Sequence, residues 1–250
     1  MESVPVYYIE KTPNTATEER LREQGIVEIH HFEEINGREL DMAHLVDTKL
    51  IGIRGYEDLT NGREQHGGIP SMGSIGCTLS HYNLWSMCVE KNMPFIGIAE
   101  NDVVFDKKLS AFGPEIKTFF DTNNAGLFVT VQVYPRNNGI LFNGTQFYYI
   151  SKAACASLME FCFPIDLQVD WYMSEMHNLG KVTIGNHPIT GQDGEESSIQ
   201  NKCFKCNYPL SADPYERRIH ELKVCLNISI VICLLLSYVY LATTRRQRVK

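Results

Sequence analysis

Short apolar runs alternate with amphipathic segments along most of the chain, and this alternation is what most limits the folds open to it. Runs with strand character lie at residues 5–10, 27–32, 95–99, 127–133, 145–150 and 181–184. Helical spacing, caps or terminating glycines mark residues 17–24, 72–92, 107–120, 151–162 and 170–180. Because strands that alternate with helices pack as a sheet covered by helices, the sequence predicts an open α/β fold.

This pattern varies in strength along the chain. It is clearest at residues 72–92, where apolar side chains recur at helical spacing and Ser74 is placed to cap the start. It is weakest from Gly37 to Pro70, where glycine and asparagine punctuate the stretch NGREQHGGIP. For this second region we expect an exposed loop.

Composition narrows the class of protein further. The 250 residues carry a net charge of −7, and 44% of them are hydrophobic, which is ample for a buried core. No basic stripe is present that could neutralise a series of phosphates. Nucleic acid is therefore not an expected partner.

The largest change in composition falls at Val224–Thr243, which is uncharged over about the 20 residues needed to cross a bilayer. A basic tail containing Arg245, Arg246 and Arg248 follows it. A long apolar run ending in basic residues favours a membrane helix over a buried core helix. We therefore expect a main domain at residues 1–200, a juxtamembrane segment at 201–223, a transmembrane helix at 224–243 and a tail at 244–250.

The orientation of this anchor stays open. The first residues contain neither a basic n-region nor a long apolar h-region, so the simplest expectation is a single-pass C-terminal anchor with a cytosolic main domain. Arg217, Arg218 and Lys223 lie just before the apolar run and nearly balance the basic tail. A lumenal main domain therefore remains the alternative.

The eight cysteines do not form the dense pattern of a disulfide scaffold, and we expect most of them to be packed thiols. Cys203 and Cys206 form one CxxC pair. A closed zinc site needs two more ligands, and no second pair exists outside the apolar run. A plain loop or a disulfide is the favoured interpretation of this pair.

Two carboxylates interrupt the apolar stretch IGIAENDVVF directly after a buried strand. Ligands of open α/β sheets bind beyond the carboxyl ends of the strands, so Glu100, Asn101 and Asp102 stand where a site would form. Carboxylates one residue apart in an extended chain can both turn toward a divalent cation. A simple turn is the alternative, since Asn and Asp are ordinary turn formers.

Five motifs in a fixed order decide between these interpretations. They are SIGCTLSHYNLW, FIGIAENDVVF, FNGTQFYYISKAA, FPIDLQVDWYM and ITGQDGEESSI. In this order they resemble glycosyltransferase family 25, which includes lipooligosaccharide and collagen galactosyltransferases, and the resemblance extends from about Val4 to Ile199. It implies a GT-A-type nucleotide-sugar-binding fold, a nucleotide-diphosphate sugar as donor, a glycan or protein acceptor, and inverting transfer assisted by Mn²⁺.

The resemblance also implies roles for individual residues. The family's strand-end motif is Glu-Asp-Asp, and Asn101 replaces its central acid, which removes one negative charge from a cation site. Asp102 is the first candidate for metal or diphosphate contact, and Glu100 is the second. His81 either contacts substrate or holds its helix to a loop. Gln192 and Asp193 lie in a glycine-flanked loop suited to binding donor or acceptor.

An inverting transfer also needs a base that deprotonates the acceptor hydroxyl. Asp170 is assigned this role, with Asp166 as the alternate, and both would face one side if the segment is already helical. Asp170 would instead be structural if it caps the helix that follows.

These features predict a membrane-anchored glycosyltransferase that moves a hexose, galactose or glucose. Asn101 motivates a second hypothesis, a catalytically inactive protein of this fold that binds partners at a membrane. A third and weaker hypothesis is a nucleotide-sugar hydrolase that uses the same carboxylates.

Overall fold

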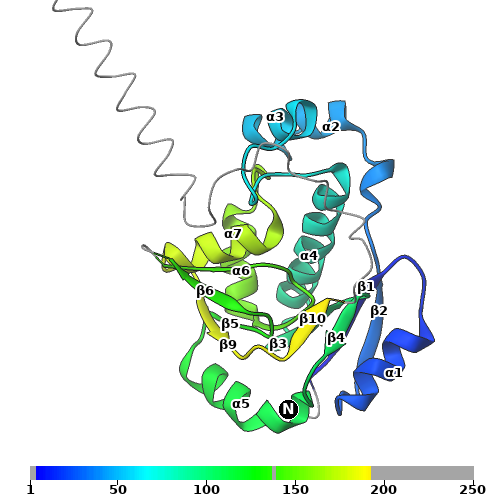
Figure 1. Cartoon of the computed structure of the whole chain (residues 1–250), viewed down its shortest axis with the longest axis vertical. Coiled ribbons are helices and arrows are strands. Elements are labelled where there is room, and N and C mark those ends of the chain that lie inside the picture. The colour runs from blue at the N-terminus through cyan, green and yellow to red at the C-terminus, as the bar shows by residue number, and fades with distance from the viewer. Residues whose placement is uncertain (1–3, 137–138, 193–250) are drawn as a thin grey trace, which may run out of the picture. The chain divides into compact units, whose positions relative to one another are not determined.

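A six-stranded mixed sheet forms the centre of the computed structural model, which describes residues 4–136 and 139–192 (Figure 1). In sheet order its strands are β2 (Ile29–Glu33), β1 (Val6–Glu10), β3 (Phe95–Glu100), β8 (Phe147–Ser151), β5 (Gly126–Val129) and β9 (Thr183–Asn186). Two small antiparallel pairs lie beside it, β4 (Val103–Phe105) with β10 (Thr190–Gln192) and β6 (Val133–Arg136) with β7 (Gly139–Phe142). The predicted α/β fold is confirmed in this part of the chain.

Strand direction determines which residues meet at one edge of the sheet. β1 runs parallel to β2 and β3, and β5 runs parallel to β9. β8 is antiparallel to both of its neighbours, β3 and β5. With Ala99 of β3 opposite Phe147 of β8, the end of β3 lies beside the residues that precede β8. The strand-end acids and the residues before β8 therefore share one edge.

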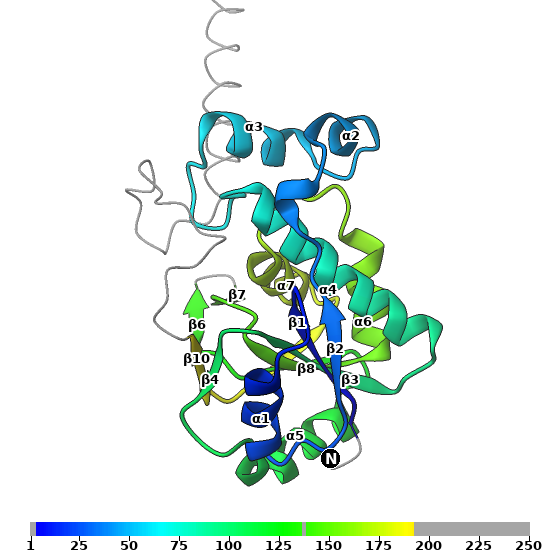
Figure 2. The same ribbon diagram turned by 90° about the vertical axis from the view of Figure 1, so that its right-hand side faces the viewer.

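Helices cover both faces of this sheet (Figures 1 and 2). The covering helices are α4 (Met72–Glu90), α6 (Lys152–Phe161) and α7 (Val169–Asn178) on one face, and α1 (Thr15–Glu23) and α5 (Gly113–Thr122) on the other. Strand side chains alternate between the two cores: Ile96 and Ile98 of β3 pack with the first group, and Ala99 packs with the second. This alternation is expected for a strand buried on both faces.

Local sequence signals explain several of the helix boundaries. Asn14 caps α1 by accepting a hydrogen bond from the backbone N–H of Ala16, and Gly25, at φ +85°, follows its end. Ser151 caps α6 as expected, accepting from Ala154 N–H. Pro114 lies in the first turn of α5, where a proline is tolerated. For α4 the predicted cap is wrong: the N-cap is Ser71, and Ser74 lies buried inside the helix.

The expectation of an exposed loop from Gly37 to Pro70 is also wrong. The segment contains η1 (Gly37–Glu39), α2 (Met42–Asp47) and α3 (Ile53–Asn61), and it folds around a small apolar cluster. Ile69, inside the glycine-rich stretch, is completely buried in that cluster. Propensity did not reveal these helices because they are short and their stability comes from tertiary burial.

The predicted transmembrane helix at 224–243 lies outside the described residues, as do the juxtamembrane segment and the tail. Among the residues that the structure describes, no helix is both long and apolar enough to span a bilayer. The four described cysteines, Cys77, Cys88, Cys155 and Cys162, are free thiols, as expected.

Candidate active site at the end of β3

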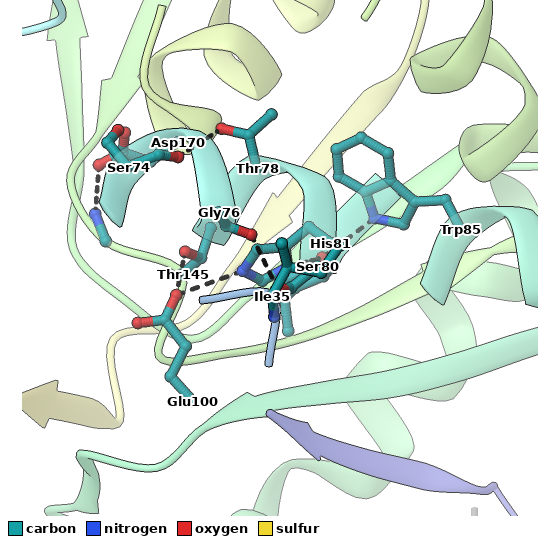
Figure 3. Close-up of polar contacts among 12 residues, drawn as sticks. Ile35, Ser74, Gly76, Thr78, Ser80, His81, Trp85, Glu100, Thr145 and Asp170 are labelled. Atoms are coloured by element: carbon teal, nitrogen blue, oxygen red, sulfur yellow. Dashed lines mark hydrogen bonds and ion pairs between the residues drawn. The ribbon is translucent and has the colours of Figure 1, made fainter. Parts of the chain in front are cut away.

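Glu100 ends β3 and makes two side-chain contacts at the edge of the sheet (Figure 3). Its Oε1 accepts a hydrogen bond from the Thr145 hydroxyl and lies 3.3 Å from His81 Nε2. Thr145 comes just before β8, which the antiparallel pairing sets beside the end of β3. The Glu100 carboxylate is therefore held by two side chains, one from α4 and one from the residues before β8.

His81 is fully buried and belongs to a chain of polar contacts. Its Nδ1 lies 2.7 Å from the Tyr148 hydroxyl, which accepts a 3.0 Å hydrogen bond from the Trp85 indole N–H. Each group has a partner if the Tyr148 O–H donates to Nδ1 and the N–H at Nε2 donates to Glu100. His81 thus joins α4 to the sheet and orients Glu100, and both of its partners among the described residues belong to strands.

The turn after Glu100 is held from a different helix. Arg20 of α1 donates to the carbonyl oxygen of Asn101 at 2.5 Å and to that of Val103 at 3.3 Å. Asn101 itself is exposed, and Asp102 is partly buried in the same turn. Arg20 gave no sequence signal because it lies 81 residues before Asn101.

Asp170 reaches the same edge from the first turn of α7. Its carboxylate is 7% exposed and accepts hydrogen bonds from Gly144 N–H at 2.6 Å and Trp171 N–H at 2.8 Å. The N-cap of α7 is Gln168, so Asp170 is not the cap, although backbone N–H groups do bind it. Asp170, the proposed base, therefore lies at this edge and contacts the loop before β8.

Burial raises the pKa of the Asp170 carboxyl to about 6. The negative charge of Glu100 raises it further, and the N–H groups of Gly144 and Trp171 oppose the change. A carboxylate with a pKa in this range can accept a proton near neutral pH.

Asp166 lies elsewhere, because the helix that would have placed it on one face with Asp170 does not extend back to it. α7 begins only at Val169, so Asp166 precedes the helix. Its Oδ1 accepts a 2.7 Å hydrogen bond from Gly55 N–H in the first turn of α3. A carboxylate at a helix N-terminus stabilises the helix, so Asp166 has a structural contact of its own.

The glycine-flanked loop approaches the strand-end turn through its backbone. β10 pairs with β4 so that Gln192 stands opposite Val103, the residue after Asp102. Asp193 lies outside the described residues. This pairing brings the Gln192 backbone beside the strand-end turn.

A divalent cation fits this edge by the chemistry of its donors. Glu100 and Asp102 supply carboxylate oxygens, which Mn²⁺ prefers. Among the described residues, both contacts of the Glu100 carboxylate fall on Oε1, which leaves Oε2 to serve as a ligand.

The fold and the site together define an α/β protein with a carboxylate cluster at the end of a central strand, and part of the chain is similar to a known family. Residues 60–130 match the family described as Glycosyltransferase family 25 (LPS biosynthesis protein). This stretch contains His81 and the turn from Glu100 to Asp102, and it ends before Asp170. The resemblance expected from the sequence is confirmed over this stretch.

Individual relatives agree with this match. A Drosophila melanogaster "Glycosyltransferase 25 family member" is 38% identical over 88 residues, which are 35% of this chain and 14% of that protein. The "Procollagen galactosyltransferase 1-B" of Xenopus laevis is 29% identical over 29% of this chain and 11% of its own length. The "Lipooligosaccharide biosynthesis protein lex-1" of Haemophilus influenzae is 36% identical over 22% and 20%. The chain thus covers a fifth or less of each of these relatives.

Proposed function

We propose that this protein is a membrane-anchored, inverting glycosyltransferase with a GT-A-type domain. It transfers a hexose, galactose or glucose, from a nucleotide-diphosphate sugar to a hydroxyl of a glycan or protein. The domain is cytosolic in this proposal, and residues 224–243 hold it at the bilayer.

One observation carries the catalytic part of the proposal. Glu100, Asp102 and Asp170 lie at the same edge of the sheet, and the negative charge of Glu100 helps to raise the pKa of the Asp170 carboxyl. A displacement at a sugar carbon needs two things at once: charge compensation for the departing diphosphate and a base for the incoming hydroxyl. At this edge Glu100 and Asp102 are the proposed cation ligands, and Asp170 is the proposed base.

The roles follow from these positions. Glu100 and Asp102 would hold a divalent cation, which when bound neutralises charge on the diphosphate. Asp170 removes the proton of the acceptor hydroxyl as that oxygen attacks the sugar. Burial keeps the Asp170 carboxyl basic enough for this step, and the N–H groups of Gly144 and Trp171 fix its orientation.

Asn101 favours one alternative, a catalytically inactive binding protein of the same fold. It lowers the charge of the strand-end motif. A Rattus norvegicus relative, 32% identical over 72 residues, carries the name "Probable inactive glycosyltransferase 25 family member 3". An inactive form would keep the fold and lose metal-dependent nucleotide binding.

Calorimetric titration of uridine diphosphate into a chain ending at Leu222, with and without Mn²⁺, tests the proposal. We expect metal-dependent binding that disappears in Asp102→Ala. No binding of uridine diphosphate, with or without Mn²⁺, would overturn the transferase proposal in favour of the inactive protein.

Product analysis with and without an acceptor then separates a transferase from a hydrolase. Transfer predicts a glycosylated acceptor that forms only when acceptor is present. Free sugar as the sole product would support the hydrolase.

A further inference from the structure

A second donor set shares Glu100 but contains sulfur and nitrogen. Cys77 and His81 lie four residues apart on α4, so their side chains lie on the same face one turn apart. One ligand atom each from Cys77, His81 and Glu100 lies within 4.8 Å of the others. The cluster is partly or fully buried at the same edge of the sheet as the candidate active site.

The spacing of two of these atoms suits a tetrahedral metal ion. His81 Nε2 and Glu100 Oε1 lie 3.3 Å apart. Two ligands at the usual zinc–nitrogen and zinc–oxygen distances are about 3.3–3.4 Å apart when the angle at the metal is tetrahedral. This pair could therefore bind one ion without moving apart, and Cys77 would complete three protein ligands.

The partners of His81 orient the ring for such binding. Nδ1 faces the Tyr148 hydroxyl, which leaves Nε2 directed at Glu100. A metal at Nε2 requires the ring proton on Nδ1, where it donates to Tyr148, and the hydrogen bond from Tyr148 O–H to Nδ1 is given up. Tyr148 also accepts from Trp85, and a phenolic oxygen has two lone pairs for these two donors.

We propose that Cys77, His81 and Glu100 form a zinc(II) site with one open coordination position. A thiolate, an imidazole and a carboxylate suit zinc, whereas Mn²⁺ prefers ligands that are all oxygen. Zinc bound here would use Oε1 of Glu100, whereas the cation that would serve the diphosphate would use Oε2 of the same carboxylate. The two ions would therefore share one carboxylate at this edge.

Cobalt(II) is the probe, because it occupies tetrahedral zinc sites and shows a thiolate-to-metal absorption band. The full chain in detergent carries Cys203→Ser and Cys206→Ser, so that the CxxC pair cannot contribute a thiolate. We expect one cobalt per chain with this band, and loss of the band when one equivalent of zinc is added.

Variants of the ligands then locate the site. Cys77→Ser and Cys77→Ala should each abolish the band, while His81→Gln should weaken cobalt binding and keep a band at higher metal concentration. Cys88→Ser is the matched control, since Cys88 lies on the same helix and belongs to the hydrophobic core instead. Near-ultraviolet circular dichroism checks that each variant folds.

A band that survives both Cys77 variants, one that requires Cys88, or no band at all would overturn the zinc site. The result is independent of transferase chemistry, because absorption reports binding alone. A chain that shows the cobalt band but does not bind uridine diphosphate would keep the zinc site and lose the proposed function.

Discussion

At the scale of single residues, Asp170 combines burial with a negative neighbour. The negative charge of Glu100 raises the pKa of the Asp170 carboxyl. The charge of Asp170 in turn raises the pKa of the Cys77 thiol, and it opposes the lowering of the Arg63 pKa by burial. The backbone N–H groups of Gly144 and Trp171 hold the carboxylate in place. Two predictions follow from this one environment, one for catalysis and one for stability.

The first concerns the proposed base. Asp170→Asn should lower kcat by roughly 10²–10⁴-fold, because general base catalysis is worth about that much. In the unchanged protein the rate should rise with pH through about 6, where the carboxylate loses its proton. Initial rates between about pH 5 and pH 8 measure both effects.

Asp166→Asn decides between the two carboxylates in the same assay. If Asp170 is the base, this variant affects stability through Gly55 and α3 more than it affects kcat. Asp121→Asn, which removes an exposed partner of Lys117, controls for loss of a surface charge. A large loss of kcat in Asp166→Asn with none in Asp170→Asn would reverse the assignment.

The second prediction concerns stability. The folded protein keeps the Asp170 proton up to about pH 6, whereas an unfolded aspartate releases it near pH 4. The folded state therefore binds more protons in this window, and the free energy of unfolding should fall by about 3 kcal/mol as pH rises through it.

Urea unfolding of the wild type and Asp170→Asn at several pH values isolates this contribution, because other titrating groups are common to both. The variant should lack this pH-dependent loss. Equal pH slopes for the two proteins would contradict a raised pKa at Asp170.

At the scale of elements, α4 and α1 hold the strand-end residues through long-range contacts, which local sequence patterns cannot predict. The helices and strands with strong periodicity, and the acids after β3, could be predicted because their signals are local. The contacts of Arg20, Thr145 and Tyr148 could not, because they depend on strand order and on one antiparallel strand. Asp166 was misplaced for a similar reason, since its partner lies 111 residues away.

The close packing of α4 against the backbone of residues 35–37 gives a prediction about stability. A Cβ at Gly76 would lie 2.2 Å from the backbone oxygen of Ile35 and 2.7 Å from Gly37 N, so the helix packs against backbone that has little room to move. Gly76→Ala should cost about 1–3 kcal/mol of stability, a usual cost of overpacking. Chemical denaturation measures this loss.

Gly113→Ala is the control for that variant. Gly113 begins α5 with helical dihedral angles, and a Cβ there meets nothing within 4 Å. This change should be neutral or stabilise by about 0.4–1 kcal/mol through the unfolded state. Equal losses in both variants would show that the contact with Ile35 is not the cause.

The second element-scale prediction tests how α1 holds the strand-end turn. Arg20→Ala should weaken metal-dependent nucleotide binding, because the carbonyl groups of Asn101 and Val103 lose their shared donor. Arg22→Ala, two residues away, removes only an exposed pair with Glu18 and should leave binding unchanged. Calorimetry compares the two, and equal affinities would mean that Arg20 does not order the turn.

At the scale of the whole molecule, the layered sheet collects polar residues from distant parts of the chain at one edge while its faces stay apolar. Glu100 comes from β3, Thr145 from the loop before β8 and Asp170 from α7. The proposed anchor, Val224–Thr243, comes later in the sequence than all of these residues. Catalysis and attachment should therefore be separable.

Membrane attachment can be measured directly. The full chain should stay with the membrane pellet after an alkaline carbonate wash, because about 20 apolar residues suffice to span a bilayer. A chain ending at Leu222 should move to the supernatant and still bind uridine diphosphate.

The orientation of the anchor is tested by glycosylation reporters. A reporter placed after Lys250 should be modified, and one placed before Val4 should not be. Modification of the N-terminal reporter would place the glycosyltransferase-like domain in the lumen instead, and full release of the unshortened chain by carbonate would rule out the anchor.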